Sequence, residues 1–309
     1  MGWLCHGKCT SKARLDGKIA VITGCNTGIG KYTALDFYRR GARVIMACRN
    51  MEKAEAARNW IVENCKNQEG LGNLVLMRLD VSSLGSVRVF SEQIMQNEQY
   101  IHLLINNAGI MMCPRTLSED GYELQFATNH LGHFLLTMLL LPKILQSGPA
   151  RIVNVSSVAH RYYSSMYFDD INMEKRYSSV YSYARSKISN ILFTKELAKR
   201  LEGSSVTVYS LHPGVVDTEL SRHWSSILFP GATWIYHNVF GFFQKTPEQG
   251  AQTTIYCAVD EKAGGESGLY YDDCEVAKPI AKAEDPELAK RLWDVSVEMV
   301  KLGSDNPFK

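Results

Sequence analysis

The stretch IAVITGCNTGIG, residues 19–30, decides the fold of this chain. An apolar run at 19–23 leads into a turn with glycines at positions 24, 28 and 30. Glycine allows a tight turn and a close approach of the backbone, and the N–H groups at the start of the next helix can hold a pyrophosphate. The spacing G-x3-G-x-G is by itself a weak signal, because plain strand–helix turns share it. Its position directly after the first strand favours a dinucleotide-binding turn.

Apolar runs alternate with helical patterns along the rest of the chain. The runs are continuously apolar, which indicates strands covered on both faces and therefore a parallel sheet between helices. We predict an α/β fold, a Rossmann-type doubly wound parallel sheet with helices on both faces, in a single domain. The expected strands are 19–23, 42–48, 74–79, 103–105, 151–155, 206–211 and, as a last edge strand, 268–271. The expected helices are 29–40, 52–65, 84–96, 117–146, 179–201 and 286–302.

The composition bounds the class of protein. The 309 residues are 45% hydrophobic and 21% charged, with a formal net charge of +2. This excludes a disordered chain and a collagen-like repeat, and it gives no global electrostatic reason to expect a nucleic acid partner. The eight cysteines form no CxxC pair and no zinc-type cluster, so we expect reduced thiols, a cytoplasmic location and no bound metal. His130 and His133 are interpreted as packed or hydrogen-bonded histidines rather than metal ligands.

The end of the second expected strand bears on the choice of cofactor. A dinucleotide fold that prefers NAD usually places Asp or Glu there, against the ribose 2′-hydroxyl. Here the strand ends in Ala47-Cys48-Arg49-Asn50. Arg49 cannot accept a bond from that hydroxyl, but it can make charge-assisted bonds to a 2′-phosphate. NADP is therefore favoured over NAD, the alternative being a solvated arginine at a strand end.

Tyr183 and Lys187 place a phenol and an ammonium four residues apart, on one face of an expected helix. Tyrosine titrates near pH 10 and is a poor base at neutrality. A neighbouring ammonium and a cationic nicotinamide favour the phenolate, so we expect a lowered pKa for Tyr183. Alone this pattern is common by chance, so whether the pair is catalytic has to be judged from the other motifs in the chain.

The chain resembles the short-chain dehydrogenase/reductase family over about residues 17–220. The glycine turn is followed, in the family's order, by Asn-Asn-Ala-Gly at 106–109, Asn-Val-Ser-Ser at 154–157, the Tyr183/Lys187 pair and His-Pro-Gly at 212–214. The stretches 47–49, 129–134 and 181–201 look like the retinol-dehydrogenase-like branch. The separation of Ser157 and Tyr183 by 26 positions is longer than in most members and predicts an extra loop at 161–182 beside the pocket.

The resemblance implies roles for individual residues. Tyr183 would be the general acid/base, Lys187 would hold the nicotinamide ribose and tune Tyr183, Ser157 would bind the substrate oxygen, and Asn129 would complete a proton relay through water. Asp80 would meet the adenine. The implied cofactor-binding residues are Gly24, Asn26, Thr27, Gly28, Ile29, Gly30, Arg49, Asp80, Asn107, Ala108, Gly109, Tyr183, Lys187, Pro213, Gly214, Val216 and Thr218.

Together these features predict an NADP(H)-dependent oxidoreductase that interconverts an apolar alcohol and its aldehyde or ketone. The alternative is a non-catalytic protein that binds NADP(H) and reports redox state, which would need the glycine turn but not the intact Ser157/Tyr183/Lys187 set. An extended sugar-nucleotide epimerase is less favoured, because only about 90 residues follow Thr218. A homodimer is compatible with this prediction.

Two segments complete the expected organisation. Residues 1–16 form a basic N-terminal segment without the apolar centre of a secretory signal, and residues 17–309 form the NADP-binding domain. Residues 224–243 carry no Asp, Glu, Lys or Arg, yet proline, glycine and asparagine interrupt them. An apolar substrate lid over 219–245, in peripheral contact with an intracellular membrane, is favoured over a spanning helix.

Overall fold

The computed structural model describes residues 7–216 and 244–309 of the chain. Thr218 and the expected lid, apart from its last two residues, lie outside these ranges. The strands are β1 (Ile19–Thr23), β2 (Arg43–Cys48), β3 (Asn73–Arg78), β4 (Leu103–Asn106), β5 (Ala150–Val155), β6 (Val206–His212), β7 (Leu269–Asp272) and β8 (Glu275–Val276). The main helices are α1 (Gly28–Arg39), α2 (Met51–Glu63), α3 (Leu84–Asn97), α4 (Leu124–Phe126), α5 (Gly132–Gln146), α6 (Ser179–Arg200), α9 (Pro247–Val259) and α10 (Pro286–Met299).

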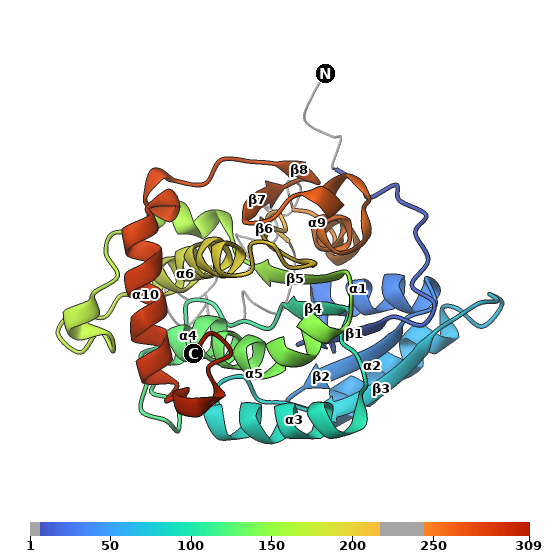
Figure 1. The fold of residues 1–309 in the computed structure, drawn as a ribbon, viewed down its shortest axis with the longest axis horizontal. Helices are drawn as coiled ribbons and strands as arrows, with labels where there is room; N and C mark the ends of the chain where they lie inside the picture. The colour runs from blue at the N-terminus through green and yellow to red at the C-terminus, as the bar shows by residue number, and fades with distance from the viewer. Residues whose placement is uncertain (1–6, 217–243) are drawn as a thin grey trace, which may run out of the picture.

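The described strands form one sheet in the order β3-β2-β1-β4-β5-β6-β7-β8, parallel except for the β7–β8 pair. The chain starts at β1, moves outward through β2 and β3, and then crosses to the other side of β1 at β4 (Figure 1). Such a reversal of strand order leaves a crevice at the carboxyl ends of the strands, where ligands bind in doubly wound folds. The predicted fold class is confirmed.

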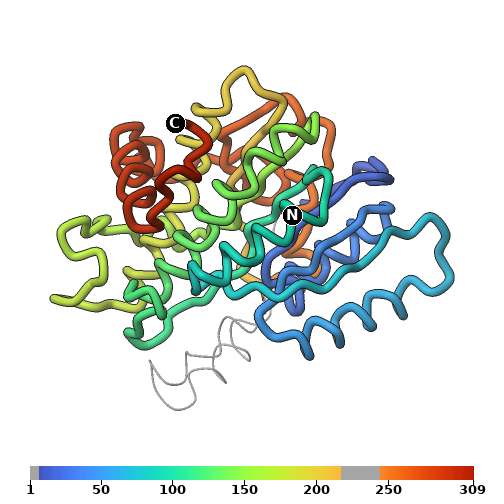
Figure 2. The backbone as a smooth tube through the Cα atoms, turned by 60° about the horizontal axis from the view of Figure 1, so that its bottom comes forward, coloured from blue at the N-terminus to red at the C-terminus, as the bar shows by residue number. Residues whose placement is uncertain are grey.

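Helices cover both faces of the sheet, as Figures 1 and 2 show. One face packs against α1, α2 and α9, and the other against α3, α5, α6 and α10. In β1, Ala20 and Ile22 are buried on the face covered by α1, α2 and α9, and Val21 is buried on the opposite face. All three side chains are fully buried. This two-sided burial explains why the strand is continuously apolar instead of alternating.

The expected single helix over 117–146 is wrong in its first part. Leu117 pairs with Glu123 in an isolated antiparallel bridge, and Gly121 between them has a positive φ of 83°. The Glu123 carboxylate then accepts bonds from the N–H groups of Gln125 and Phe126, which starts α4. A π-helical turn, Ala127–Leu131, joins α4 to α5.

Two further elements differ from expectation near the carboxyl terminus. Helix α9 was not anticipated, although Thr246 and Gln249 form a capping box at its start. The strand expected at 268–271 is β7, but it is not the last strand of the described sheet, because β8 pairs with it antiparallel. The sequence Asp273-Cys274 makes the connecting turn with two positive φ angles, 52° and 64°.

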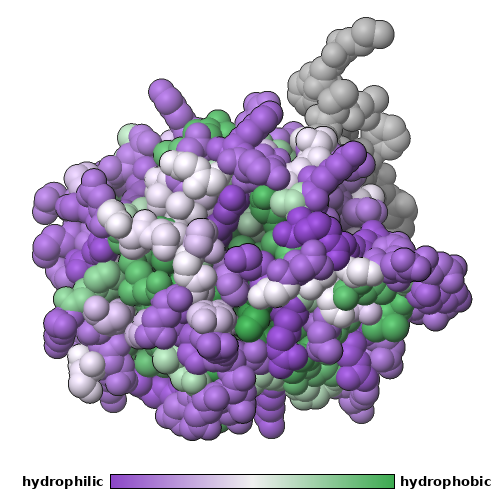
Figure 3. Space-filling model, turned by 45° about the vertical axis from the view of Figure 1, so that its right-hand side comes forward, coloured by the Kyte–Doolittle hydropathy of each residue, from purple (hydrophilic) through white to green (hydrophobic). Residues whose placement is uncertain are grey.

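The surface shown in Figure 3 is mostly hydrophilic, with hydrophobic side chains scattered among the polar ones. Within the two described ranges no helix combines the length and apolarity needed to cross a membrane. Before β1 the chain lies against the body of the fold: the Leu15 N–H donates to the Arg40 carbonyl at 2.7 Å, and the Cys9 N–H donates to Gln252 Oε1 at 3.2 Å.

Candidate active site

A cavity of about 760 Å³ lies at the carboxyl ends of the central strands. The glycine turn after β1, the ends of β2, β4, β5 and β6, and one face of α6 form its walls. It is lined by Gly24, Asn26, Thr27, Gly28, Ile29, Gly30, Arg49, Asp80, Asn107, Ala108, Gly109, Ser157, Tyr183, Lys187, Pro213, Gly214 and Val216. The fold therefore brings together the residues predicted from the sequence, except that Asn129 lies behind the wall and Thr218 lies outside the described residues.

The glycine turn is packed too tightly for side chains. Gly24 has a positive φ of 65°, and a Cβ there would lie 2.9 Å from the Cα of Ala108. A Cβ on Gly30 would lie 2.8 Å from the Gly24 carbonyl oxygen. Thr27 is the N-cap residue of α1, yet its hydroxyl makes no capping bond. The N–H groups at this helix start are thus left to an anionic ligand, for which the helix dipole is favourable.

A buried threonine fixes the turn against β4. Thr23 Oγ1 accepts from the N–H groups of Asn107 and Ala108, both at 2.9 Å, and contacts His133 Nε2 at 2.9 Å. The Asn107 side-chain amide donates to the Thr23 carbonyl at 2.8 Å. These bonds hold the loop after β4 beside the glycine turn, so both line the same cavity.

The two histidines are hydrogen-bonded inside the core. His130 Nε2 lies 2.9 Å from Ser296 Oγ, and His133 bonds Thr23. Burial lowers the pKa of His130 to about 3 and that of His133 to about 4, so both are neutral at pH 7. The described residues contain no group of three or more His, Cys, Asp or Glu side chains placed to hold a metal ion.

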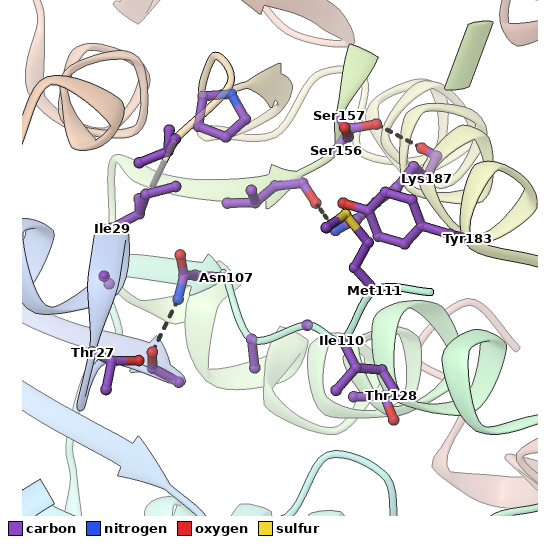
Figure 4. Close-up of a pocket in the computed structure, with 18 of the residues that line it drawn as sticks. Thr27, Ile29, Asn107, Ile110, Met111, Thr128, Ser156, Ser157, Tyr183 and Lys187 are labelled. Carbon is purple, nitrogen blue, oxygen red and sulfur yellow. Dashed lines mark hydrogen bonds between the residues drawn. The ribbon is translucent and has the colours of Figure 1, made fainter. Parts of the chain in front are cut away.

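Tyr183 and Lys187 reach the cavity from α6, and both are almost fully buried. Ser178 caps the start of this helix by accepting from the Tyr181 N–H. Lys187 Nζ lies 5.6 Å from the centre of the Tyr183 ring and donates to the Val155 carbonyl at 3.1 Å. Figure 4 shows Tyr183, Lys187 and Ser157 on one side of the cavity, with Thr27, Ile29 and Asn107 across from them.

The pKa of Tyr183 differs from expectation. Burial raises it to about 12, although a hydrogen bond from Ser157 lowers it. Burial also lowers the pKa of Lys187 to about 8. The expectation of a lowered tyrosine pKa counted the ammonium and a cationic nicotinamide but not the loss of solvent around the phenol, and in the protein alone desolvation is the largest effect.

Asn129 sits in the π-helical turn and is fully buried behind the cavity wall. Its Oδ1 accepts from the Ile110 N–H at 2.9 Å, and its Nδ2 donates to the Ile110 carbonyl and to Ser186 Oγ, both at 2.9 Å. These bonds tie the loop after β4 to α6. They give the side chain a positioning role, while the relay role stays a prediction.

The far end of the cavity carries positive charge at the start of α2. Arg49 is 64% exposed and its Nη1 lies 3.7 Å from Asp80 Oδ2, a loose, solvated ion pair. Lys53 lines the same end, and its N–H is capped by Asn50 Oδ1 at 2.8 Å. Lys53 was not among the residues predicted from the sequence, although its position four residues after Arg49 could have indicated it.

The cavity also has apolar lining residues that no motif predicted. Ile110, Met111 and Met112 from the loop after β4, together with Val158 and Val180, line the same cavity as Tyr183. Such residues follow no periodic pattern, because each comes from a loop or an element end. They suit a predominantly apolar ligand.

Comparison with known proteins agrees with this geometry. The short chain dehydrogenase family model matches residues 18–227. The chain is 47% identical to retinol dehydrogenase 11 of Homo sapiens over 302 residues, covering 98% of this chain and 92% of that one. It is also 47% identical to human retinol dehydrogenase 13, covering 96% and 88%. A crystal structure of an uncharacterized protein from Mycobacterium paratuberculosis matches with a TM-score of 0.75 at 32% identity, covering 96% and 98%.

These likenesses extend over nearly the whole chain, and the tyrosine, the lysine, the serine and the glycine turn meet in one cavity of a Rossmann-type fold. The chain belongs to the short-chain dehydrogenase/reductase family, oxidoreductases that bind a nicotinamide cofactor, and it is retinol-dehydrogenase-like.

Proposed function

We propose that this protein is an NADP(H)-dependent oxidoreductase that interconverts an apolar alcohol and its aldehyde or ketone. The observation that carries the proposal is the single cavity that joins Tyr183, Lys187 and Ser157 at one end to Arg49 at the other, with the glycine turn between them. A dinucleotide lying on that turn would place its two ends at these two groups.

Each residue at the catalytic end has one task. When bound, the nicotinamide supplies or accepts a hydride. In the direction of reduction, the Tyr183 O–H gives its proton to the carbonyl oxygen, and in oxidation the phenolate takes it back. Ser157 donates a hydrogen bond to the same oxygen, and Lys187 supplies positive charge beside the phenol. Burial raises the pKa of Tyr183 to about 12, which keeps the phenol protonated and suited to reduction.

Cofactor preference rests on the positive end of the cavity. The 2′-phosphate of NADP would lie against Arg49 and Lys53, which both line the cavity. No acidic residue occurs between Arg43 and Met51 to accept from the 2′-hydroxyl of NAD. A bidentate bond from arginine to phosphate is stronger than a neutral hydrogen bond and specific in geometry. These features support NADP(H) over NAD(H).

The substrate class rests on the apolar residues that line the same cavity as Tyr183. Met111, Val158 and Val180 offer hydrocarbon surface, while Ser157 and Tyr183 supply the polar contacts for one oxygen. Because two relatives are named retinol dehydrogenase, a retinoid is one of the alcohols to test as a substrate. The lid over 219–245, contact with a membrane surface and a homodimer stay predictions.

The competing function, a non-catalytic sensor of NADP(H), is less well supported because Ser157, Tyr183 and Lys187 are all present and line one cavity. A turnover assay separates the two. The purified protein is given NADPH or NADH with short and long aldehydes, a retinoid aldehyde among them, and loss of reduced cofactor is followed. Oxidation of NADPH that depends on a long apolar aldehyde supports the proposal, whereas tight NADPH binding without turnover of any carbonyl would favour the sensor.

A further inference from the structure

Two cysteines lie against each other behind the glycine turn. The Sγ atoms of Cys25 and Cys48 are 3.8 Å apart, and both thiols are free and buried. The pairing of β1 with β2 brings them together. Thr23 is the register partner of Ala47, Cys48 follows Ala47 directly as the last residue of β2, and Cys25 lies two residues after Thr23. The Gly24 N–H donates to the Ala47 carbonyl at 2.9 Å and holds the turn in this place.

The two thiols are not equivalent. The contact with the Cys25 thiol and the backbone N–H groups of Cys25 and Asn26 hold the pKa of Cys48 below its ordinary value. The Cys25 thiol also lies 3.3 Å from the Ile22 carbonyl oxygen, to which it donates. Burial, together with the bond to Cys48, raises the pKa of Cys25. Because the thiolate is the nucleophile in thiol oxidation, Cys48 is the sulfur that reacts first and Cys25 is placed to resolve it.

We propose that Cys25 and Cys48 form a redox-active pair, that a peroxide converts it to a disulfide, and that this disulfide weakens cofactor binding. In the first step the Cys48 thiol gives up its proton, its thiolate attacks one peroxide oxygen, and the O–O bond breaks. The leaving hydroxide takes up that proton, so a sulfenic acid and water form. In the second step the Cys25 sulfur attacks the Cys48 sulfur, the S–O bond breaks, and a disulfide and a second water form. Two thiols are oxidised and one hydrogen peroxide is reduced to two waters.

Closing the bond ties the glycine turn covalently to the end of β2. A disulfide brings its sulfur atoms to about 2.05 Å, so the two sulfurs must approach by about 1.8 Å. Cys25 lies between Gly24 and Asn26 of the turn, and Cys48 directly precedes Arg49, and all three of these neighbours line the cavity. The turn is also tightly packed against the loop after β4, where Gly24 contacts Ala108. The part of this approach that side-chain rotation does not supply displaces the N–H groups proposed to hold the pyrophosphate, together with Arg49, and the affinity measurement below detects that displacement.

The route to the thiols runs through the cofactor cavity. Cys25 is 0% and Cys48 1% exposed, so peroxide cannot reach them from the outer surface without opening of the structure. The cavity is the approach that we assign to peroxide, because residues flanking both cysteines line it. A bound cofactor would cover this approach, so oxidation should be slower when NADP is present.

Mass spectrometry tests the bond itself. The reduced protein is treated with hydrogen peroxide, with or without NADP, its remaining thiols are blocked, and it is digested with trypsin. The expected product joins residues 19–31 to residues 44–49 and is lighter by two hydrogen atoms than the sum of the two reduced peptides. A Cys48 that proceeds to sulfinic acid with Cys25 still reduced would overturn the pairing.

Cofactor affinity tests the consequence, with each variant compared with itself before and after peroxide. We expect the treated wild type to bind NADP at least tenfold more weakly and to recover on reduction with dithiothreitol. Cys25→Ala and Cys48→Ala should show no such reversible loss, whereas Cys65→Ala, which removes another buried thiol beyond the end of α2, should behave as wild type. A joined peptide without loss of affinity would overturn the coupling. Failure of the untreated protein to bind NADP would instead contradict the proposed function, since the joined peptide is measured independently.

Discussion

The imidazole of His160 is hydrogen-bonded to the backbone of Ser157: Nδ1 lies 2.7 Å from the Ser157 carbonyl oxygen. On its other side the Ile280 N–H donates to His160 Nε2 at 3.3 Å. A carbonyl can only accept and an N–H can only donate, so these partners fix the neutral tautomer with its proton on Nδ1. His160 is fully buried and thus links the end of β5 to a segment 120 residues away. It is a positioning residue for Ser157.

Two amide variants distinguish the hydrogen bond of His160 to Ser157 from its hydrogen bond to Ile280. His160→Asn can present an amide N–H near the position of Nδ1 and keep the bond to Ser157, whereas His160→Gln can present its carbonyl near Nε2 and lose that bond. We expect His160→Gln to lower kcat about tenfold, with the NADP Kd unchanged, and His160→Asn to retain most of kcat. Steady-state kinetics and a cofactor titration measure both quantities, and equal losses in the two variants would show a merely structural role.

Lys187 should reduce the stability of the protein while serving its function. Burial lowers its pKa from 10.5 to about 8. Below pH 8 the ammonium is therefore charged in both states, and this charge costs more free energy in the folded protein than in the unfolded chain. This corresponds to roughly 3 kcal/mol. Lys187→Met should therefore raise the free energy of unfolding at pH 7, because Asn190 still donates to the Val155 carbonyl that the lysine leaves. Activity should be lost.

The pH dependence gives the sign of this effect. As the pH rises from 8 to 10.5, native Lys187 releases its proton before the unfolded chain does, so the wild type should approach the stability of the methionine variant. Denaturant unfolding at several pH values measures the difference, and Lys290→Met, which removes an exposed lysine, serves as the control. A wild type that is the more stable protein at pH 7 would contradict the argument.

Arg49 should determine cofactor preference. A hydrogen bond to a charged group is worth about 1.5–3 kcal/mol, or roughly 10–150-fold in affinity. We expect the wild type to favour NADP(H) over NAD(H) by at least tenfold in kcat/KM, and Arg49→Asp to abolish or reverse this preference. Lys66→Asp makes the same change of charge outside the cavity and should leave the ratio unchanged. The assays need fixed ionic strength, because salt screens part of the effect. Equal efficiency with NADH and NADPH in the wild type would remove the role assigned to Arg49.

The sequence was sufficient to predict a feature where that feature requires one particular type of residue. Glycines 24 and 30 are required by the close approach of Ala108 and of the turn's own backbone, and the continuous apolar run of β1 reflects helices on both faces. Local patterns therefore predicted the sheet and the glycine turn, and the resemblance to the family added most of the other predicted residues that line the cavity.

What the sequence could not predict depends on contacts between distant residues. The start of α4 depends on the Glu123 carboxylate, which accepts from the N–H groups of Gln125 and Phe126, and the backbone of Glu123 is bridged to Leu117. Glu123 also faces Arg185 at 3.6 Å, with both side chains fully buried, and no spacing along the chain indicates that pair. The raised pKa of Tyr183 is likewise a consequence of burial, which a motif does not contain.

The assignment of Tyr183 as the acid/base is the central claim, and replacement of its hydroxyl tests it most directly. Tyr183→Phe keeps the ring among its neighbours and removes only the transferable proton, a contribution of about 10²–10⁴-fold or more. Tyr181→Phe, on the same helix but exposed and outside the cavity, is the matched control. The measurement is single-turnover oxidation of bound NADPH by an apolar aldehyde. We predict a loss of at least a hundredfold for Tyr183→Phe with NADPH affinity retained, and near wild-type turnover for Tyr181→Phe; a Tyr183→Phe variant that turns over at close to the wild-type rate would contradict the account.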